Sequence, residues 1–339
     1  MMVNREFMKE IKISEIEGFR IGNAQNKKGG TGCTAILCEK GAVGGVDVRG
    51  GGPATRETNL LESEKMCNEV YAVMLSGGSA FGLDAATGAM KYLEERGMGF
   101  DVGVGCVPIV PAASLFDLVS GDSACRPDAA MGYEACVASE KNDPEKGNFG
   151  AGTGATVGKY LGVDRLMKGG LGIYAIRIGR LKIGAVVAVN CLGDVFDADT
   201  GKQLAGILTE DGKRLDSTRN IMWSSVEQEK NVFTGNTTIG CIITNAELTK
   251  PQCNKLASMA HDGYAAAIKP VHTSADGDTI FYLAKGEVNV NQDALGDLGA
   301  YVMAKAINEG VKSATSAYGF KAMCDLKDLG ENNEEDSDH

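Results

Sequence analysis

Short apolar runs recur along the chain, each bounded by glycines or polar turn residues. Runs of this length, enriched in β-branched residues, predict buried strands. The turn signal Gly179-Arg180 joins two of them into a predicted hairpin. The predicted strands cover residues 19–24 (a strand or a turn), 32–39, 42–50, 70–75, 172–178, 182–190, 238–244 and 279–284.

Longer segments place apolar or small residues three and four positions apart, which predicts helices. The segment from about 80 to 96 has small residues on one face and charged residues such as Lys91 on the other. Thr249 is a suitable N-cap for the helix that follows it. The predicted helices cover about 80–96, 133–138, 250–268 and 293–313. Blocks of strands alternate with helices, so we expect a layered α/β or α+β sandwich.

Glycine is unusually frequent, with 46 residues among 339. The glycines cluster between apolar runs, which indicates tight junctions between elements rather than a linker. The run 150–159 resembles a phosphate-binding loop. However, Thr153 occupies a position that requires glycine, and Tyr160 replaces the Ser or Thr expected after Lys159. Nucleotide binding is therefore disfavoured, although the backbone N–H groups of such a run suit an oxyanion or a carboxylate.

The net charge of −11 argues against nucleic acid or an anionic membrane as a partner. Residues 331–339 form an acidic run that we expect to be a disordered tail. No apolar run is long enough to span a bilayer, and the charged N-terminal residues do not fit a signal peptide, so we expect a cytoplasmic protein.

The ten cysteines include no Cys-x-x-Cys pair, which fits a reduced compartment. The three histidines lack metal-ligand spacing, and His339 lies in the acidic run. A histidine-based site would have to use His261 or His272. The sequence therefore favours chemistry that needs no histidine, metal or organic cofactor.

The candidate chemistry lies at the junction Gly235-Asn236-Thr237, where a turn meets a predicted strand. A threonine at this position could be the nucleophile of a self-cleaving hydrolase, because a cut before it gives one residue both a hydroxyl and a free α-amine. Such an amine titrates near pH ~7.7–8.0, so it can act as a base at neutral pH. The polar stretch 210–236 is predicted to be a long exposed loop leading to this junction. The plain alternative is a Gly-Asn turn before an ordinary strand threonine.

Several motifs, taken in their order and spacing, resemble the DmpA-type family of self-processing aminopeptidases, which includes β-aminopeptidases, L-aminopeptidase/D-esterases and nylon-oligomer hydrolases. The resemblance covers about residues 18–324. It rests on Gly-Gly-Val-Asp-Val-Arg-Gly-Gly at 44–51, Leu-Ser-Gly-Gly-Ser-Ala-Phe-Gly-Leu at 75–83, Val-Pro-Ile-Val-Pro-Ala-Ala at 107–113, the run 150–159, Ala-Val-Val-Ala-Val-Asn at 185–190 and the junction Asn236-Thr237.

The resemblance implies an αββα four-layer sandwich similar to N-terminal nucleophile hydrolases. It implies a cut between Asn236 and Thr237 that leaves an α fragment, 1–236, and a β fragment, 237–339, which stay together and form a homo-tetramer. The implied substrate is a small peptide or an amide oligomer, such as a 6-aminohexanoate (nylon) oligomer. Hydrolysis of nylon oligomers would then be incidental to the natural activity.

The resemblance also implies roles for individual residues. Thr237 is the nucleophile, and Asn190 stabilises the oxyanion. Lys159 is a cation that lowers the pKa of the α-amine, and the pair Asp276 and Asp278 holds that amine.

Two departures from the family pattern matter. Thr237 and the Asp276/Asp278 pair stand where β-aminopeptidases have serine and a Ser/Glu pair, which favours the nylon-oligomer branch. Phe116 stands at a substrate-contacting position where some members carry tyrosine, so it lacks a hydroxyl.

Two other functions remain open from the sequence. An acyltransferase resembling ornithine acetyltransferase also cleaves itself before a threonine, but it passes the acyl group to an amine. A non-catalytic small-molecule binding protein could keep the same fold with an uncut chain.

Overall fold

The computed structural model describes residues 7–227 and 235–330, with side chains to 326. Within these residues the alternating apolar segments pair into one 10-stranded mixed sheet. Its order is β1-β11-β12-β15-β17-β3-β5-β8-β4, and β2 pairs with β3 beside this path. The strands of this sheet are β1 (Met8–Glu10), β2 (Arg20–Asn26), β3 (Thr31–Val48), β4 (Ala54–Arg56), β5 (Glu69–Ser76), β8 (Ala112–Ser114), β11 (Gly170–Ile178), β12 (Leu181–Val189), β15 (Ile239–Ala246) and β17 (Thr279–Val288).

Smaller pairings lie around this sheet. They are β6 (Phe100–Asp101) with β7 (Cys106–Val107), β9 (Thr156–Val157) with β10 (Met167–Lys168), and β14 (Gln203–Ala205) with β13 (Asp194–Phe196) and β16 (Ile268–Lys269). The α-helices of the described residues are α1 (Ala85–Glu94), α2 (Ala129–Ala138), α3 (Thr218–Ser224), α4 (Lys250–Ala267), α5 (Gln292–Lys312) and α6 (Met323–Gly330).

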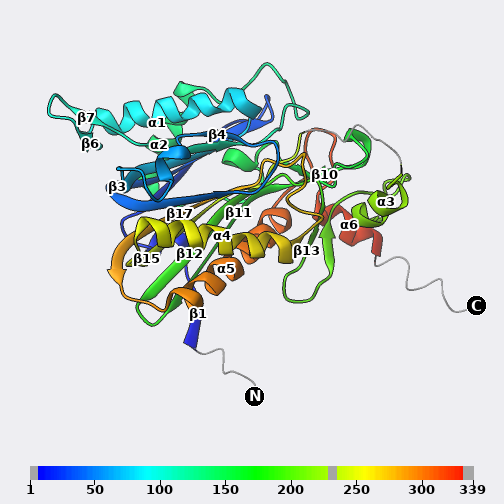
Figure 1. Ribbon diagram of the computed structural model, residues 1–339. Coiled ribbons are helices and arrows are strands. Elements are labelled where there is room, and N and C mark those ends of the chain that lie inside the picture. The colour runs from blue at the N-terminus through cyan, green and yellow to red at the C-terminus, as the bar shows by residue number, and fades with distance from the viewer. Residues whose placement is uncertain (1–6, 228–234, 331–339) are drawn as a thin grey trace, which may run out of the picture.

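The large sheet folds back on itself to give two β layers, and helices cover both outer faces (Figure 1). Side chains of β12 alternate between two cores: Val187 faces α4 and α5, whereas Val186 faces the second β layer. Residues of β3 alternate in the same way, with Leu37 facing α1 and α2. Three separate apolar cores therefore lie between four layers, as expected for an αββα sandwich.

One long strand, β3, links the two β layers. Its first half pairs with β2 and β5, and its second half pairs with β17, with an irregularity between Leu37 and Ala42. The sequence predicted two strands here, 32–39 and 42–50, separated at Gly41. The prediction of two separate strands was wrong. Gly41 adopts φ +72°, so the chain bends there and continues as one strand.

The other predicted elements match the structure closely. Helix α4 begins after Thr249, whose backbone N–H donates to Gln252 Oε1 (2.8 Å). The predicted hairpin forms as β11 and β12, and the predicted helix 80–96 begins as a 3₁₀ turn before α1. Within the described residues, no helix combines the length and the apolar character needed to cross a membrane.

The predicted long loop 210–236 is only partly irregular. Leu208 and Leu215 pair across a turn, and Thr218–Ser224 form α3, which Ser217 caps by accepting from the Asn220 N–H (3.2 Å). The rest of this stretch includes residues 228–234, which lie outside the described residues. The acidic run 331–339, predicted to be a disordered tail, lies outside them as well.

The topology brings three strand ends to one place. Strand β15 lies in the middle of the sheet, antiparallel to β12 and parallel to β17. The end of β12 therefore meets the beginnings of β15 and β17. Asn190 follows β12, Thr237 and Thr238 precede β15, and Asp278 precedes β17. The fold thus gathers three segments that are distant in sequence around the Asn236–Thr237 bond.

Candidate active site

Thr237 is buried at the start of β15, with 5% of its surface exposed. Its backbone N–H donates to the Asn190 carbonyl oxygen (2.9 Å). Its hydroxyl Oγ1 donates to the carbonyl oxygen of Asn236, the residue directly before it. The same carbonyl oxygen accepts the backbone N–H of Gly277 (3.0 Å). The hydroxyl therefore lies beside the Asn236–Thr237 peptide bond, which the sequence predicts to be the cleavage site.

Gly277 is confined against Thr237, the predicted nucleophile. A Cβ at this position would lie 2.6 Å from Thr237 Oγ1 and 3.1 Å from Thr237 Cγ2. Because glycine has no Cβ, the Gly277 N–H can donate to the Asn236 carbonyl oxygen without displacing the Thr237 side chain. An N–H donor on a carbonyl oxygen is the arrangement that stabilises negative charge developing there.

Lys159 and Asn190 form the opposite wall of the site. Lys159 is fully buried, and its Nζ donates to Asn190 Oδ1 (2.5 Å) and to the Gly235 carbonyl oxygen (2.7 Å). Asn190 Oδ1 also accepts the Thr156 N–H (3.0 Å), and Asn190 Nδ2 donates to the Phe116 carbonyl oxygen (3.1 Å). Both residues therefore touch the segment that carries the Asn236–Thr237 bond.

Burial lowers the pKa of Lys159 to about 7. The sequence resemblance implied a cation at this position. A lysine with this pKa has both charged and neutral forms near pH 7, and the neutral form can accept a proton.

The two aspartates make different contacts. Asp278 Oδ1 accepts the backbone N–H of Thr238 (2.8 Å), the residue after the predicted nucleophile. Asp276 Oδ2 accepts the N–H (2.8 Å) and the hydroxyl (2.7 Å) of Thr273. Burial, with the nearby charge of Asp278, raises the pKa of Asp276 to about 6. The structure therefore brings both carboxylates to the site, and Asp278 holds the chain at Thr238 rather than at Thr237.

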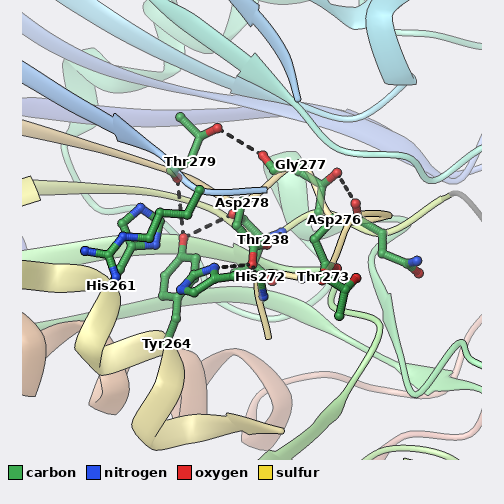
Figure 2. Close-up of polar contacts among 12 residues, drawn as sticks. Thr238, His261, Tyr264, His272, Thr273, Asp276, Gly277, Asp278 and Thr279 are labelled. Atoms are coloured by element: carbon green, nitrogen blue, oxygen red, sulfur yellow. Dashed lines mark hydrogen bonds and ion pairs between the residues drawn. The ribbon is translucent and has the colours of Figure 1, made fainter. Parts of the chain in front are cut away.

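Sequence reasoning missed a histidine in this cluster. His272 Nδ1 lies 2.8 Å from Asp278 Oδ2, and the ring packs against His261 and Tyr264 (Figure 2). The available signal was the spacing of six residues between His272 and Asp278, which a turn before β17 brings together. The sequence favoured chemistry that needs no histidine and named His261 and His272 as the candidates for a histidine-based site; the structure places His272 against Asp278.

Phe116 reaches the site through its backbone. Its carbonyl oxygen accepts from Asn190, and its side chain is half-buried. The glycine-rich run 150–159 packs against backbone instead of forming a phosphate loop: a Cβ at Gly152 would lie 2.0 Å from the Leu171 nitrogen. Two of its residues contact Asn190: the Thr156 N–H and Lys159 Nζ both donate to Asn190 Oδ1. Among the described residues, no three His, Cys, Asp or Glu side chains are grouped so that they could hold a metal ion.

Comparisons with known proteins identify the family of the chain. The model of peptidase family S58 matches residues 12–324. An uncharacterized aminopeptidase of Mycobacterium leprae (strain TN) is 37% identical, over 93% of this chain and 93% of its own length. A 6-aminohexanoate-oligomer endohydrolase of Kocuria sp. (strain KY2) is 30% identical, over 88% of this chain and 85% of its own length.

Two solved structures share the fold at low sequence identity. A β-aminopeptidase of Burkholderia sp. superposes with a TM-score of 0.68 at 18% identity, covering 95% of this chain and 93% of that one. The L-aminopeptidase D-Ala-esterase/amidase of Ochrobactrum anthropi, described as a variant of the Ntn hydrolase fold, gives a TM-score of 0.68 at 16% identity, covering 95% and 94%. These two structures therefore show that the chain shares its four-layer fold with them.

Proposed function

The chain belongs to peptidase family S58 and is a hydrolase of peptide or amide bonds, and we propose that it creates its own nucleophile by cutting itself between Asn236 and Thr237. The observation that carries this proposal is the environment of the Asn236 carbonyl. Its oxygen contacts the Thr237 hydroxyl and accepts the Gly277 N–H at 3.0 Å. A nucleophile and an oxyanion donor therefore already flank this peptide bond in the uncut chain.

The proposed cut proceeds in two steps. Thr237 Oγ forms a bond to the Asn236 carbonyl carbon and gives its proton to neutral Lys159, while the Gly277 N–H stabilises the oxyanion. The bond from that carbon to the Thr237 nitrogen then breaks, and the nitrogen takes a proton from Lys159. The resulting ester is hydrolysed by water, which leaves a carboxylate on Asn236 and a free amine and hydroxyl on Thr237.

Turnover follows the same chemistry on a substrate amide. Only 5% of Thr237 is exposed in the intact chain, so self-cleavage must precede substrate binding. The α-amine of Thr237, with an ordinary pKa of ~7.7–8.0, then takes the hydroxyl proton. Asn190 Nδ2 carries two hydrogens, so its bond to Phe116 leaves a second hydrogen for the substrate oxyanion. Phe116 is proposed to contact the substrate through its side chain.

The proposed fragments, 1–236 and 237–339, are interleaved. Strands β15 and β17 of the second fragment lie between β12 and β3 of the first. Separating them would open the centre of the sheet and expose apolar cores on both of its faces. The fragments are therefore expected to stay associated after the cut.

The proposed substrates are short peptides or linear amide oligomers, a class supported by the names of the aminopeptidase and oligomer-hydrolase relatives. The test is an assay with L-alanine p-nitroanilide and with linear 6-aminohexanoate oligomers, with and without ornithine as an amine acceptor. We expect free acid as the product in both conditions. Capture of the acyl group by ornithine would contradict hydrolysis and indicate an acyltransferase.

We expect Gly277→Ala to slow self-cleavage about tenfold or more. The new Cβ would lie 2.6 Å from Thr237 Oγ1, so the hydroxyl must move from the Asn236 carbonyl. Gly52→Ala is the matched control, because the nearest atom to a Cβ there is 3.8 Å away. The measurement is the fraction of uncut chain over time on a denaturing gel. Equal rates for the two variants would argue against the positioning of Thr237 by Gly277.

We expect Asn190→Ala to lower kcat of the processed protein by about 10²–10³-fold, the usual cost of losing one oxyanion donor. The control is Asn245→Ala: Asn245 is also a buried asparagine with two hydrogen bonds to backbone, but it lies at the far end of β15. A similar loss of kcat in both variants would mean that Asn190 acts only through stability.

The proposal extends to assembly as a homo-tetramer. The hairpin of β6 and β7 supports self-association, because Val104 is 97% exposed and Phe100 is 44% exposed. Light scattering on the processed protein measures its mass directly, and a monomer would contradict this part of the proposal.

A further inference from the structure

The residue after the nucleophile, Thr238, is held through its backbone on both sides. Its N–H donates to Asp278 Oδ1 (2.8 Å). Its carbonyl oxygen accepts the Tyr264 hydroxyl (3.2 Å) and the Thr279 N–H (3.1 Å). Figure 2 shows these groups converging on Thr238 from α4 and from the start of β17.

These contacts gain importance once the chain is cut. In the intact chain the peptide bond to Asn236 fixes Thr237 from the other side as well. After the cut, the only covalent link between Thr237 and the rest of the protein is its peptide bond to Thr238. The orientation of the new amine and hydroxyl then depends on how firmly Thr238 is held.

Asp278 is itself oriented by His272. Its Oδ2 atom lies 2.8 Å from His272 Nδ1 and accepts the His272 backbone N–H (3.2 Å). In the arrangement that we infer, Nδ1 carries the hydrogen and donates it to this carboxylate oxygen. With 1% of the Asp278 side chain exposed, water cannot easily replace this donor.

The His272 ring is fixed on its other sides. It stacks on Tyr264 (ring centroids 5.9 Å apart, planes at 23°) and meets His261 edge-on (4.7 Å, 73°). Burial lowers the pKa of His261 to about 4, so this neighbour stays uncharged. His272 also adopts φ +56°, a conformation that costs free energy for a residue with a side chain. A strained backbone at a residue with these contacts suggests that its position serves the site.

We propose that His272 is a positioning residue for turnover: its Nδ1–H keeps the Asp278 carboxylate on the Thr238 N–H, and so holds the free Thr237 in its reactive orientation. This inference rests on the proposed self-cleavage. It concerns the step after the cut, because the intact chain fixes Thr237 from both sides.

The test compares His272→Asn with His272→Asp in the full-length protein. Both side chains have the same size, both tolerate φ near +56°, and both remove the same ring contacts. Asparagine can place an N–H donor where Nδ1 was, whereas aspartate places an acceptor against the Asp278 carboxylate. We expect both variants to cut themselves, with kcat of the asparagine variant within about threefold of wild type. We expect kcat of the aspartate variant to fall at least tenfold, with a smaller change in KM.

Two results would overturn the proposal: equal kcat values for the two variants, or a tenfold loss in the asparagine variant. If the aspartate variant does not fold, His272→Gly takes its place, because glycine also suits a positive φ and offers no side-chain donor. Failure of the wild-type chain to cut itself would instead refute the proposed function, so the two failures are distinguishable.

Discussion

Replacement of Thr237 by alanine is expected to leave the chain uncut and to abolish amide hydrolysis. The hydroxyl is the proposed nucleophile of both reactions, and removal of such a group costs on the order of 10⁶ in rate. Thr237→Ser keeps the hydroxyl and should still cut itself and turn over substrate. The measurement is the intact mass of each purified variant after prolonged incubation, followed by the amidase assay.

Thr244→Ala is the matched control for this experiment. Thr244 is a fully buried threonine of β15, the strand that follows Thr237, and its hydroxyl donates to the Lys182 carbonyl oxygen (2.8 Å) far from the junction. We expect this variant to cut itself normally. A cut chain in Thr237→Ala would contradict the assignment of the nucleophile.

Replacement of Lys159 by methionine is expected to slow self-cleavage by about 10²–10⁴-fold at pH 8, the usual contribution of a general base. Burial lowers the pKa of Lys159 to about 7. The neutral, proton-accepting form therefore predominates above about pH 7, and the wild-type rate should fall as the pH drops below that value. In Lys159→Met this dependence should disappear, because the titrating group is gone. Self-cleavage measured by gel between pH 5 and pH 9 tests both expectations.

Lys250→Met serves as the control for loss of a buried lysine. Only 3% of Lys250 is exposed, and its Nζ donates to the carbonyl oxygens of Leu60 (2.8 Å) and Lys65 (3.0 Å), away from the junction. Its rate and pH dependence should match those of wild type. If the Lys159 variant retained the wild-type pH profile, another group would be the base.

The sequence was sufficient for much of the fold because local patterns determine it. The hairpin of β11 and β12 has alternating apolar residues and a glycine turn, and α4 has a capping residue and a helical period. The connection through β3 could not be predicted in the same way. Gly41 reads as a turn, and only pairing with β5 and β17 on either side of it makes the strand continuous.

Only part of the candidate site could be predicted, because some of its contacts form between segments that are distant in sequence. The junction before Thr237 was visible as a motif, and the family resemblance supplied Lys159 and Asn190. The six-residue spacing of His272 and Asp278 is a weak signal by itself, because their contact also depends on a turn and on packing against α4. The pKa of Lys159 depends on burial by segments distant in sequence, and a charge count cannot reveal it.

The most direct test of the account is the intact mass of the purified wild-type protein, combined with N-terminal sequencing of each fragment. We expect two chains, residues 1–236 and 237–339, with the second beginning Thr-Thr-Ile-Gly. A single uncut chain after prolonged incubation, or a fragment that begins at any other residue, would contradict the assignment of Thr237 as a nucleophile made by self-cleavage.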